Sequence, residues 1–121
     1  MKPAPALPKK FKFGPFQFSI RLVDSPGRER SEDGEALNDG FTDMSNCIMY
    51  ISKNLAPYMT AVTIHHECGH VIRHVFGGTE TANSEKQEEH NVNIYSVGYI
   101  MLEQDNPNLM EYFDYYLRNK R

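Results

Sequence analysis

The sequence predicts a single α+β domain in which a small antiparallel sheet is followed by two or three helices. Two patterns lead to this prediction. Between residues 11 and 52, apolar and polar residues alternate with the period of two that is typical of half-buried strands. From residue 57 onward, apolar residues recur at helical spacing, with proline and glycine where helices begin and end. At 121 residues, the chain has room for one domain with one modest core.

The first ten residues differ in composition from the rest of the chain. They hold three of the seven prolines and three lysines. We therefore expect residues 1–10 to form a flexible basic arm and residues 11–121 to form one domain. Basic residues near a terminus can contact nucleic acid, but a solvated tail is the simpler interpretation of so short a run.

The segment FKFGPFQFSIRLV, residues 11–23, alternates in character. Its apolar residues fall on one face of an extended chain and its polar residues on the other, which predicts one half-buried strand. The apolar face consists of Phe16, Phe18, Ile20 and Leu22. The next segment, residues 24–39, is rich in acids and turn formers and predicts a surface loop.

The segment GFTDMSNCIMYISK, residues 40–53, predicts a β-hairpin. Strand-forming residues occupy its two ends, and turn-forming residues occupy positions 43–46. A helix is then expected from Pro57, which suits a first helical turn, to about Phe76. The pair Gly77-Gly78 that follows favours a stop.

Two further helices are expected in the last third of the chain. The first begins near Ser84, whose spacing from Gln87 resembles a capping box, and ends at about Glu103. The second begins at Asn106 and Pro107, which suit a cap and a first turn. Its apolar stripe consists of Leu109, Met110, Phe113, Tyr116 and Leu117.

The helix expected after Pro57 contains the sequence HECGH, from His66 to His70, which fits the pattern H-E-x-x-H. Histidines four residues apart lie on one face of a helix, so both imidazoles can reach one metal ion at ~2.0–2.1 Å. Glu67 follows His66 and lies one residue further round the helix, where its carboxylate can accept a proton from water at the metal. Gly69 lets another segment approach closely. Chance would give only about 0.02 such matches in a chain of this composition, which favours a metal site over a solvated helix.

A catalytic zinc site needs a third protein ligand. In metzincins a histidine six residues beyond the motif supplies it, but that position holds Phe76. The next helix offers carboxylates instead: Glu85, Glu88 and Glu89, with His90 beside them. Two neighbouring apolar stripes of this helix lead to different carboxylates, so the residues alone leave the choice open. The stripe that continues to Glu88 is Val92, Tyr95, Tyr99 and Leu102, and the stripe that continues to Glu89 is Val92, Ser96, Tyr99 and Ile100.

Residues 40–107 resemble a group of small, largely phage-encoded H-E-x-x-H proteins with a minimal, gluzincin-like zincin domain. More distantly, they are similar to the ImmA/IrrE and SprT-like metallopeptidases. GFTDMSNCIMYISKNL resembles the hairpin that enters the active-site helix, TIHHECGHVI resembles the metal helix, and EEHNV with GYIMLEQDNPNL resembles the helix that follows. In that group the metal-binding glutamate usually lies three residues before an aliphatic residue, which implies Glu89, before Val92.

The resemblance implies a phage or mobile-element protein with a zincin-like fold that binds one Zn²⁺ per chain. The implied ligands are His66, His70 and Glu89, with Glu88 as the alternate third ligand. Glu67 is then the general base of a metallopeptidase that uses water to hydrolyse a peptide bond in a protein or extended peptide. An oxyanion helper is also expected. The candidates are Tyr95, Tyr99, His65 and His74.

The composition argues against several other classes of protein. The net charge of −3 gives no global attraction to nucleic acid, and the longest apolar run, Cys47–Ile51, is too short to span a membrane. The amino terminus lacks the apolar stretch of a secretory signal, and two cysteines make no disulfide framework, so we expect a cytoplasmic protein. The main alternative is a zincin-shaped module that binds a host factor or repressor and holds a structural or vestigial metal. The intact Glu67 favours catalysis.

Overall fold

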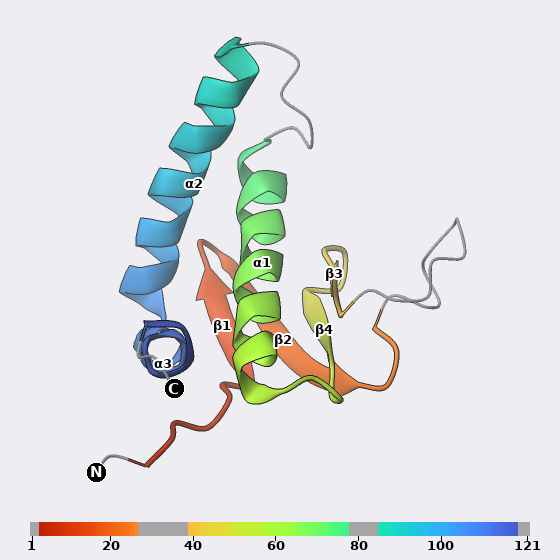
Figure 1. Ribbon diagram of the computed structural model, residues 1–121. Coiled ribbons are helices and arrows are strands. Elements are labelled where there is room, and N and C mark those ends of the chain that lie inside the picture. Colours follow the sequence, from red (N-terminus) through yellow and green to blue (C-terminus); the bar gives the residue numbers. More distant parts are fainter. Residues whose placement is uncertain (1–2, 27–38, 78–84, 119–121) are drawn as a thin grey trace.

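The computed structural model describes residues 3–26, 39–77 and 85–118, except for the side chains of residues 85–89. A four-stranded sheet in the order β1-β2-β4-β3 is covered on one face by helix α1. Helix α2 runs beside α1 in the opposite direction, and α3 lies near the end of α2 next to β1 (Figure 1). Strands come first and helices after, so the predicted α+β class is confirmed.

The segment predicted to be one strand forms two. Strand β1 (Lys10–Phe13) turns through two residues into β2 (Phe16–Val23), and the strands pair antiparallel. The single-strand prediction was wrong because Gly14 adopts a left-handed φ of +57°, a conformation that glycine accepts without steric cost. The alternation itself holds, since Phe18 and Ile20 are buried, but Phe16 and Leu22 at the strand ends are exposed.

The predicted hairpin is confirmed, with strands β3 (Gly40–Asp43) and β4 (Ile48–Ser52) pairing antiparallel. The sheet is nevertheless mixed, because β4 pairs parallel with β2. The expectation of an antiparallel sheet is therefore wrong for this one pairing. Strand β4, the second strand of the hairpin, lies between β2 and β3, so β3 is at the edge of the sheet.

Helix α1 (Pro57–Phe76) begins and ends where the sequence predicts. It stops at Gly77, whose left-handed φ of +71° lets its N–H reach the carbonyls of Arg73 and His74. The face turned to the sheet carries small and aliphatic side chains. Its fully buried apolar residues are Ala61, Ile64, Cys68, Val71 and Ile72.

Helix α2 (Glu85–Asp105) packs closely on α1 because glycine replaces a side chain on each helix. A Cβ atom at Gly98 would lie 2.3 Å from Cγ2 of Ile72, and one at Gly69 would lie 3.1 Å from the Tyr99 hydroxyl. The expectation that Gly69 permits a close approach is confirmed. The predicted capping residues Ser84 and Gln87 lie outside the described side chains.

The buried stripe of α2 differs from the one expected. Of the two stripes considered, Leu102 is buried and Tyr95 and Tyr99 are half-buried, but Val92 is 58% exposed and Ile100 is 56% exposed. The side of the helix that is buried or half-buried includes residues outside these stripes as well. Its members among the described residues are Asn91, Ile94, Tyr95, Gly98, Tyr99, Met101 and Leu102.

Helix α3 (Pro107–Phe113) begins as predicted and continues as the π-helical turn η1 (Asp114–Arg118). The predicted stripe is correct in outline, since Leu109 and Phe113 are buried and the other members are half-buried. Tyr112, which the stripe omitted, is 4% exposed. Burial, and then the neighbouring Tyr116, raise the pKa of Tyr112 to about 12.

Asn106 precedes α3 at the cap position, but its side chain bonds elsewhere. Its amide nitrogen donates to the carbonyls of Lys12 (2.6 Å) and Leu102 (2.9 Å), and its Oδ1 accepts from the Lys12 N–H (2.7 Å). The cap interaction expected from the sequence is therefore replaced by pairing with the outer edge of β1. The amide occupies the position that a further strand would take.

Two predictions concern parts of the chain that the structure describes only partly. Most of the predicted loop at 24–39 lies outside the described residues. In the arm, residues 3–8 form no helix or strand, and Leu7 packs against the core; the domain boundary at residue 10 stays a prediction. None of the described helices is long and apolar enough to cross a membrane.

We predict that Asn106→Ala lowers the free energy of unfolding by about 2–4 kcal/mol, because it removes three hydrogen bonds from a buried amide to the backbone of Lys12 and Leu102. Urea unfolding followed by circular dichroism measures this. Asn108→Ala, an exposed asparagine in the same helix, is the matched control and should change stability by less than about 0.5 kcal/mol. Equal effects of the two substitutions would contradict the assigned role.

Candidate metal centre

His66 and His70 lie one turn apart on the side of α1 that is not buried against the sheet. Their Nε2 atoms are 3.0 Å apart, and their rings stand nearly perpendicular, at 88°. His66 is exposed and His70 is half-buried, so the pair is open to solvent. The helix therefore brings together the two histidines that the motif predicts.

These residues form a donor set that fits a metal ion. One ligand atom from each of His66, Glu67 and His70 lies within 4.8 Å of the others. Two nitrogens held at ~2.0–2.1 Å on a tetrahedral zinc ion would be roughly 3.3 Å apart. The observed separation of 3.0 Å is within a few tenths of an ångström of that value. Two imidazoles beside a carboxylate are also ligands that zinc accepts.

Glu67 is buried between α1 and the edge strand β3, with only 5% of its surface exposed. Its Oε1 accepts a hydrogen bond of 2.8 Å from the hydroxyl of Thr42 on β3. The strand comes this close because Gly40 has no side chain: a Cβ there would lie 2.8 Å from Thr63 Cγ2 and 3.1 Å from Glu67 Cγ. The carboxylate is thus fixed against the strand and does not move freely in solvent.

Arg73 contacts the second motif histidine from the following turn of α1. Its Nη2 lies 2.8 Å from Nδ1 of His70. A guanidinium group can only donate, so Nδ1 accepts, and a neutral His70 ring carries its proton on Nε2, toward His66. A metal ion bound at Nε2 would displace that proton to Nδ1, and Arg73 would then have to leave this contact.

Two of the four oxyanion candidates lie between helices. The ring of His65 stacks on Tyr99 at 4.8 Å, and the Tyr99 hydroxyl donates to the His65 carbonyl at 3.1 Å. Both line a cavity of about 250 Å³ between α1, α2, α3 and η1, to which the motif residues His66, Glu67 and His70 do not contribute. Burial, and then His66, lower the pKa of His65. Burial is also the main reason that the pKa of Tyr99 is raised.

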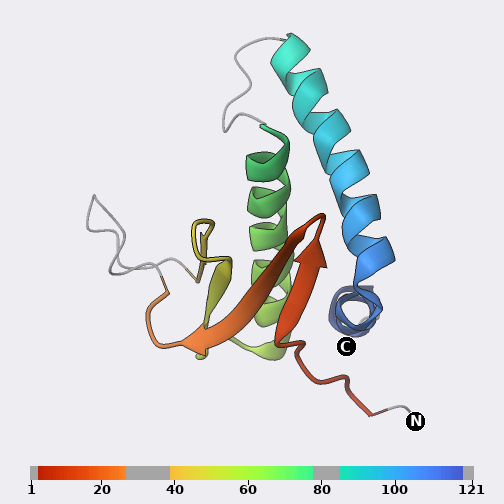
Figure 2. The same ribbon diagram turned by 180° about the vertical axis from the view of Figure 1, so that it is seen from behind.

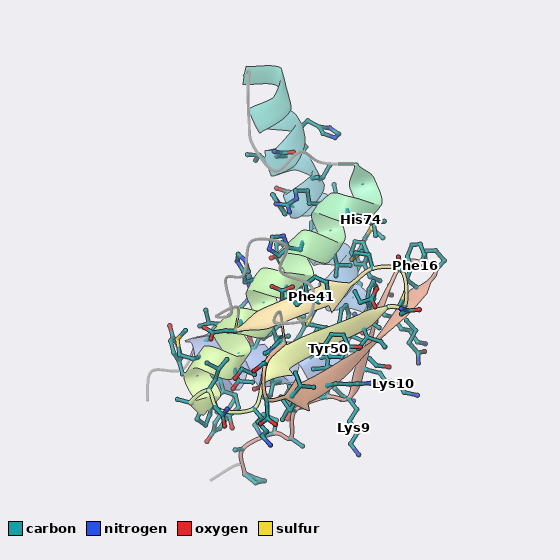
Figure 3. All side chains as sticks on the ribbon, turned by 90° about the vertical axis from the view of Figure 1, so that its right-hand side faces the viewer. Lys9, Lys10, Phe16, Phe41, Tyr50 and His74 are labelled. Carbon is teal, nitrogen blue, oxygen red and sulfur yellow. The ribbon has the colours of Figure 1, made fainter. Side chains whose placement is uncertain are left out.

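The other two candidates lie at different depths. Tyr95 is half-buried beside Tyr99, with ring centroids 6.4 Å apart, and faces Gly69. His74 is exposed one turn beyond His70, near the end of α1 (Figure 3). Of the four candidates, His74 alone extends the exposed row of motif histidines, and an oxyanion role stays a prediction for each.

Cys68 lies within the motif but belongs to the core. Its side chain is 1% exposed, and burial, followed by the charge of Glu67, raises the pKa of the thiol. The thiol therefore stays protonated, and metal ligands need the thiolate. The sulfur packs behind the histidines as a small apolar group.

The third ligand lies outside the described side chains, because those of Glu85, Glu88 and Glu89 are not described. The resemblance selects Glu89, and the choice between Glu89 and Glu88 stays a prediction.

Two residues at the site were not expected from the sequence. Arg73 could have been found, because a residue three positions after His70 shares its helix face. Thr42 carries no such signal: it is 25 residues from Glu67, and the strand pattern alone does not show which part of the sheet meets the motif.

A small α+β domain whose first long helix presents an H-E-x-x-H cluster beside an edge strand defines the zincin-like class of fold. Residues 17–119 match the peptidase family M78, described as the IrrE N-terminal-like domain. The match covers most of the chain, so the protein belongs to this family, and the resemblance to the ImmA/IrrE group is confirmed. No curated protein and no solved structure matches the chain.

We predict that the purified protein binds about one zinc ion per chain, and that His66→Ala or His70→Ala abolishes this binding. Each substitution removes one of two imidazoles that converge on the same point. Elemental analysis after dialysis measures the stoichiometry. His74→Ala, on the same row of the helix, is the control and should keep full zinc. Stoichiometric zinc in either motif variant would show that the ligand assignment is wrong.

We predict that the third ligand is one of two adjacent carboxylates. Either Glu88→Gln or Glu89→Gln should weaken zinc binding at least ~10-fold more than Glu85→Gln, because loss of a direct ligand costs more than loss of a nearby charge. Competition with a chromophoric zinc chelator measures the affinities. A larger loss at Glu89 supports the family alignment, and a larger loss at Glu88 moves the ligand to the alternate position. If all three variants bound zinc with the same affinity, the third ligand would not lie on this helix.

Proposed function

We propose that the protein is a zinc-dependent metallopeptidase that hydrolyses a peptide bond in a protein or extended peptide. The observation that carries this proposal is the buried Glu67, held by Thr42 beside the paired Nε2 atoms of His66 and His70. A purely structural metal site has no need for a fixed carboxylate next to its ligands. Membership of a peptidase family supports the same conclusion.

Glu67 is the proton carrier in this proposal. The Thr42 hydroxyl donates to Oε1, which orients the carboxylate and leaves Oε2 for proton transfer. Oε2 accepts a proton from the attacking water and then delivers it to the nitrogen of the leaving amine. Burial against β3 keeps the carboxylate in one position during both transfers.

The metal would be held by His66, His70 and one carboxylate of the Glu88/Glu89 pair. Zinc, when bound, supplies a Lewis acid that polarises the scissile carbonyl and lowers the pKa of the attacking water toward ~7. A donor to the developing oxyanion is also required. Among the four candidates, we choose His74, which is exposed on the same row of α1 as the two motif histidines.

The substrate would bind along β3. This strand lies at the edge of the sheet, and among the described residues no strand pairs with its outer side. An extended peptide can therefore add to β3 through backbone hydrogen bonds. Thr42 belongs to this strand and bonds to Glu67, so a peptide that pairs with β3 passes close to the proton carrier.

We predict that Glu67→Gln keeps the fold and the zinc but lowers peptide cleavage by about 10²–10⁴-fold. Glutamine has the same shape and can still accept the Thr42 hydrogen bond, but it cannot take a proton from water. Wild type and variant are incubated with a proteome-derived peptide library, and new termini are counted by mass spectrometry. Glu111→Gln, an exposed glutamate on α3, is the charge-matched control and should cleave like wild type.

Zinc-loaded wild type that produces no new termini from peptides or from a cell lysate would contradict the peptidase. If wild type and Glu67→Gln then captured the same protein from the lysate equally well, the alternative would hold. The protein would be a zincin-shaped binding module in which the metal is structural or vestigial.

A further inference from the structure

The face of the sheet turned away from α1 is not covered by any described helix, and Figure 2 shows β1 and β2 in front of α1 in the view from behind. Strand alternation decides which residues this face carries. The buried partners Phe18, Met49 and Ile51 point toward α1, so their neighbours point the other way. The open face consists of Lys10, Lys12, Gln17, Ser19, Arg21, Val23, Phe41, Asp43, Ile48, Tyr50 and Ser52.

This open face is cationic although the whole chain has a net charge of −3. Lys10, Lys12 and Arg21 are exposed, and their side chains make no ion pair with any other described residue. The one carboxylate on the face, Asp43, is 3% exposed and accepts hydrogen bonds from the backbone and side chain of Asn46. Figure 3 shows Lys10 extending from the sheet on the side away from α1.

Two aromatic side chains lie beside one of these cations. The register places Arg21 opposite Tyr50 across β2 and β4, and Tyr50 opposite Phe41 across β4 and β3. Adjacent strands are about 4.8 Å apart, so the three side chains form a row about 10 Å long across the face. Tyr50 and Phe41 are half-buried, and the alternation of β3 and β4 places both on the open face. Lys10 and Lys12 on β1 lie at the end of the sheet beyond Arg21.

We propose that this open face binds single-stranded nucleic acid, with the phosphates near Lys10, Lys12 and Arg21 and the bases stacked on Tyr50 and Phe41. Cations supply affinity for the backbone, and flat aromatic rings on a sheet stack unpaired bases of any sequence. In a duplex the base faces are already stacked, so an aromatic row favours a single strand.

Two other occupants fit less well. A second copy bound by two-fold symmetry would enclose Lys10, Lys12 and Arg21 of both chains in one interface, and the one carboxylate on the face, Asp43, is buried and already hydrogen-bonded. An acidic polypeptide would neutralise the cations, but it has no requirement for an aromatic row. The proposal does not depend on peptidase activity, because the histidine cluster lies on α1 at the other face of the sheet.

The experiment measures fluorescence anisotropy of a labelled oligo(dT) 12-mer with the zinc-loaded, full-length protein at several salt concentrations. The affinity should fall with salt, with a slope of about −0.7 for each phosphate contact. Tyr50→Leu should weaken binding roughly 5- to 100-fold at an unchanged slope, and Tyr50→Phe should restore it. Lys10→Gln and Lys12→Gln should each make the slope shallower by about 0.7.

Matched controls lie on other surfaces of the molecule. Tyr58→Leu removes a tyrosine that is 55% exposed on α1, and Arg118→Gln removes a cation near the carboxyl end; neither should change the affinity. Thermal melting checks that every variant is folded. Failure of the wild type to bind at low salt would overturn the proposal. Equal competition by a duplex of the same length would also overturn it. A third result would also overturn it: a polyglutamate peptide displaces the labelled oligonucleotide as well as unlabelled oligo(dT) does, and Tyr50→Leu leaves the affinity unchanged. These two observations together would assign the face to an acidic polypeptide.

Discussion

The hydrogen bond between Thr42 and Glu67 connects the sheet to the helix that carries the histidines. A carboxylate with 5% exposure is costly to bury unless it is hydrogen-bonded, and the hydroxyl of Thr42 supplies that partner. The bond requires β3 to lie almost against α1, which only a residue without a side chain at Gly40 allows. The position of the hairpin, the path of the edge strand and the orientation of Glu67 therefore depend on one another.

Helix α1 meets three different surroundings around its circumference, and its sequence is divided among them. The side that faces the sheet carries aliphatic residues. The side that faces α2 has Gly69, which lets α2 pack closely, and the remaining side carries His66 and His70. The five residues of the motif HECGH face all three surroundings. Cys68 packs in the core, Gly69 lies against α2, and the two histidines lie on the remaining side. Substitutions in this segment are therefore expected to affect packing and chemistry together.

The local elements were largely predictable from the sequence, and their arrangement in space was not. Helix α1 was predicted to the residue, because Pro57 and Gly77 are strong start and stop signals. The turn at Gly14 was missed although the alternation changes phase there, from Phe11 and Phe13 at odd positions to Phe16 and Phe18 at even positions. The parallel pairing of β2 with β4 and the contact of Thr42 with Glu67 depend on long-range packing, for which a single chain's periodicity carries no signal. The H-E-x-x-H pair was predictable because helical spacing alone brings its histidines together.

Asn106 closes one edge of the sheet at Lys12, and at the other edge no strand of the described residues pairs with the outer side of β3. A sheet with a single usable edge cannot grow into a filament by adding copies side by side, because each copy has only one place to join. Edge-to-edge association would stop at a pair. That pair would be joined through the two β3 strands, and it would cover the outer backbone groups of β3, the strand that holds Glu67, in both copies. Self-association and substrate access would then exclude each other at the same backbone groups.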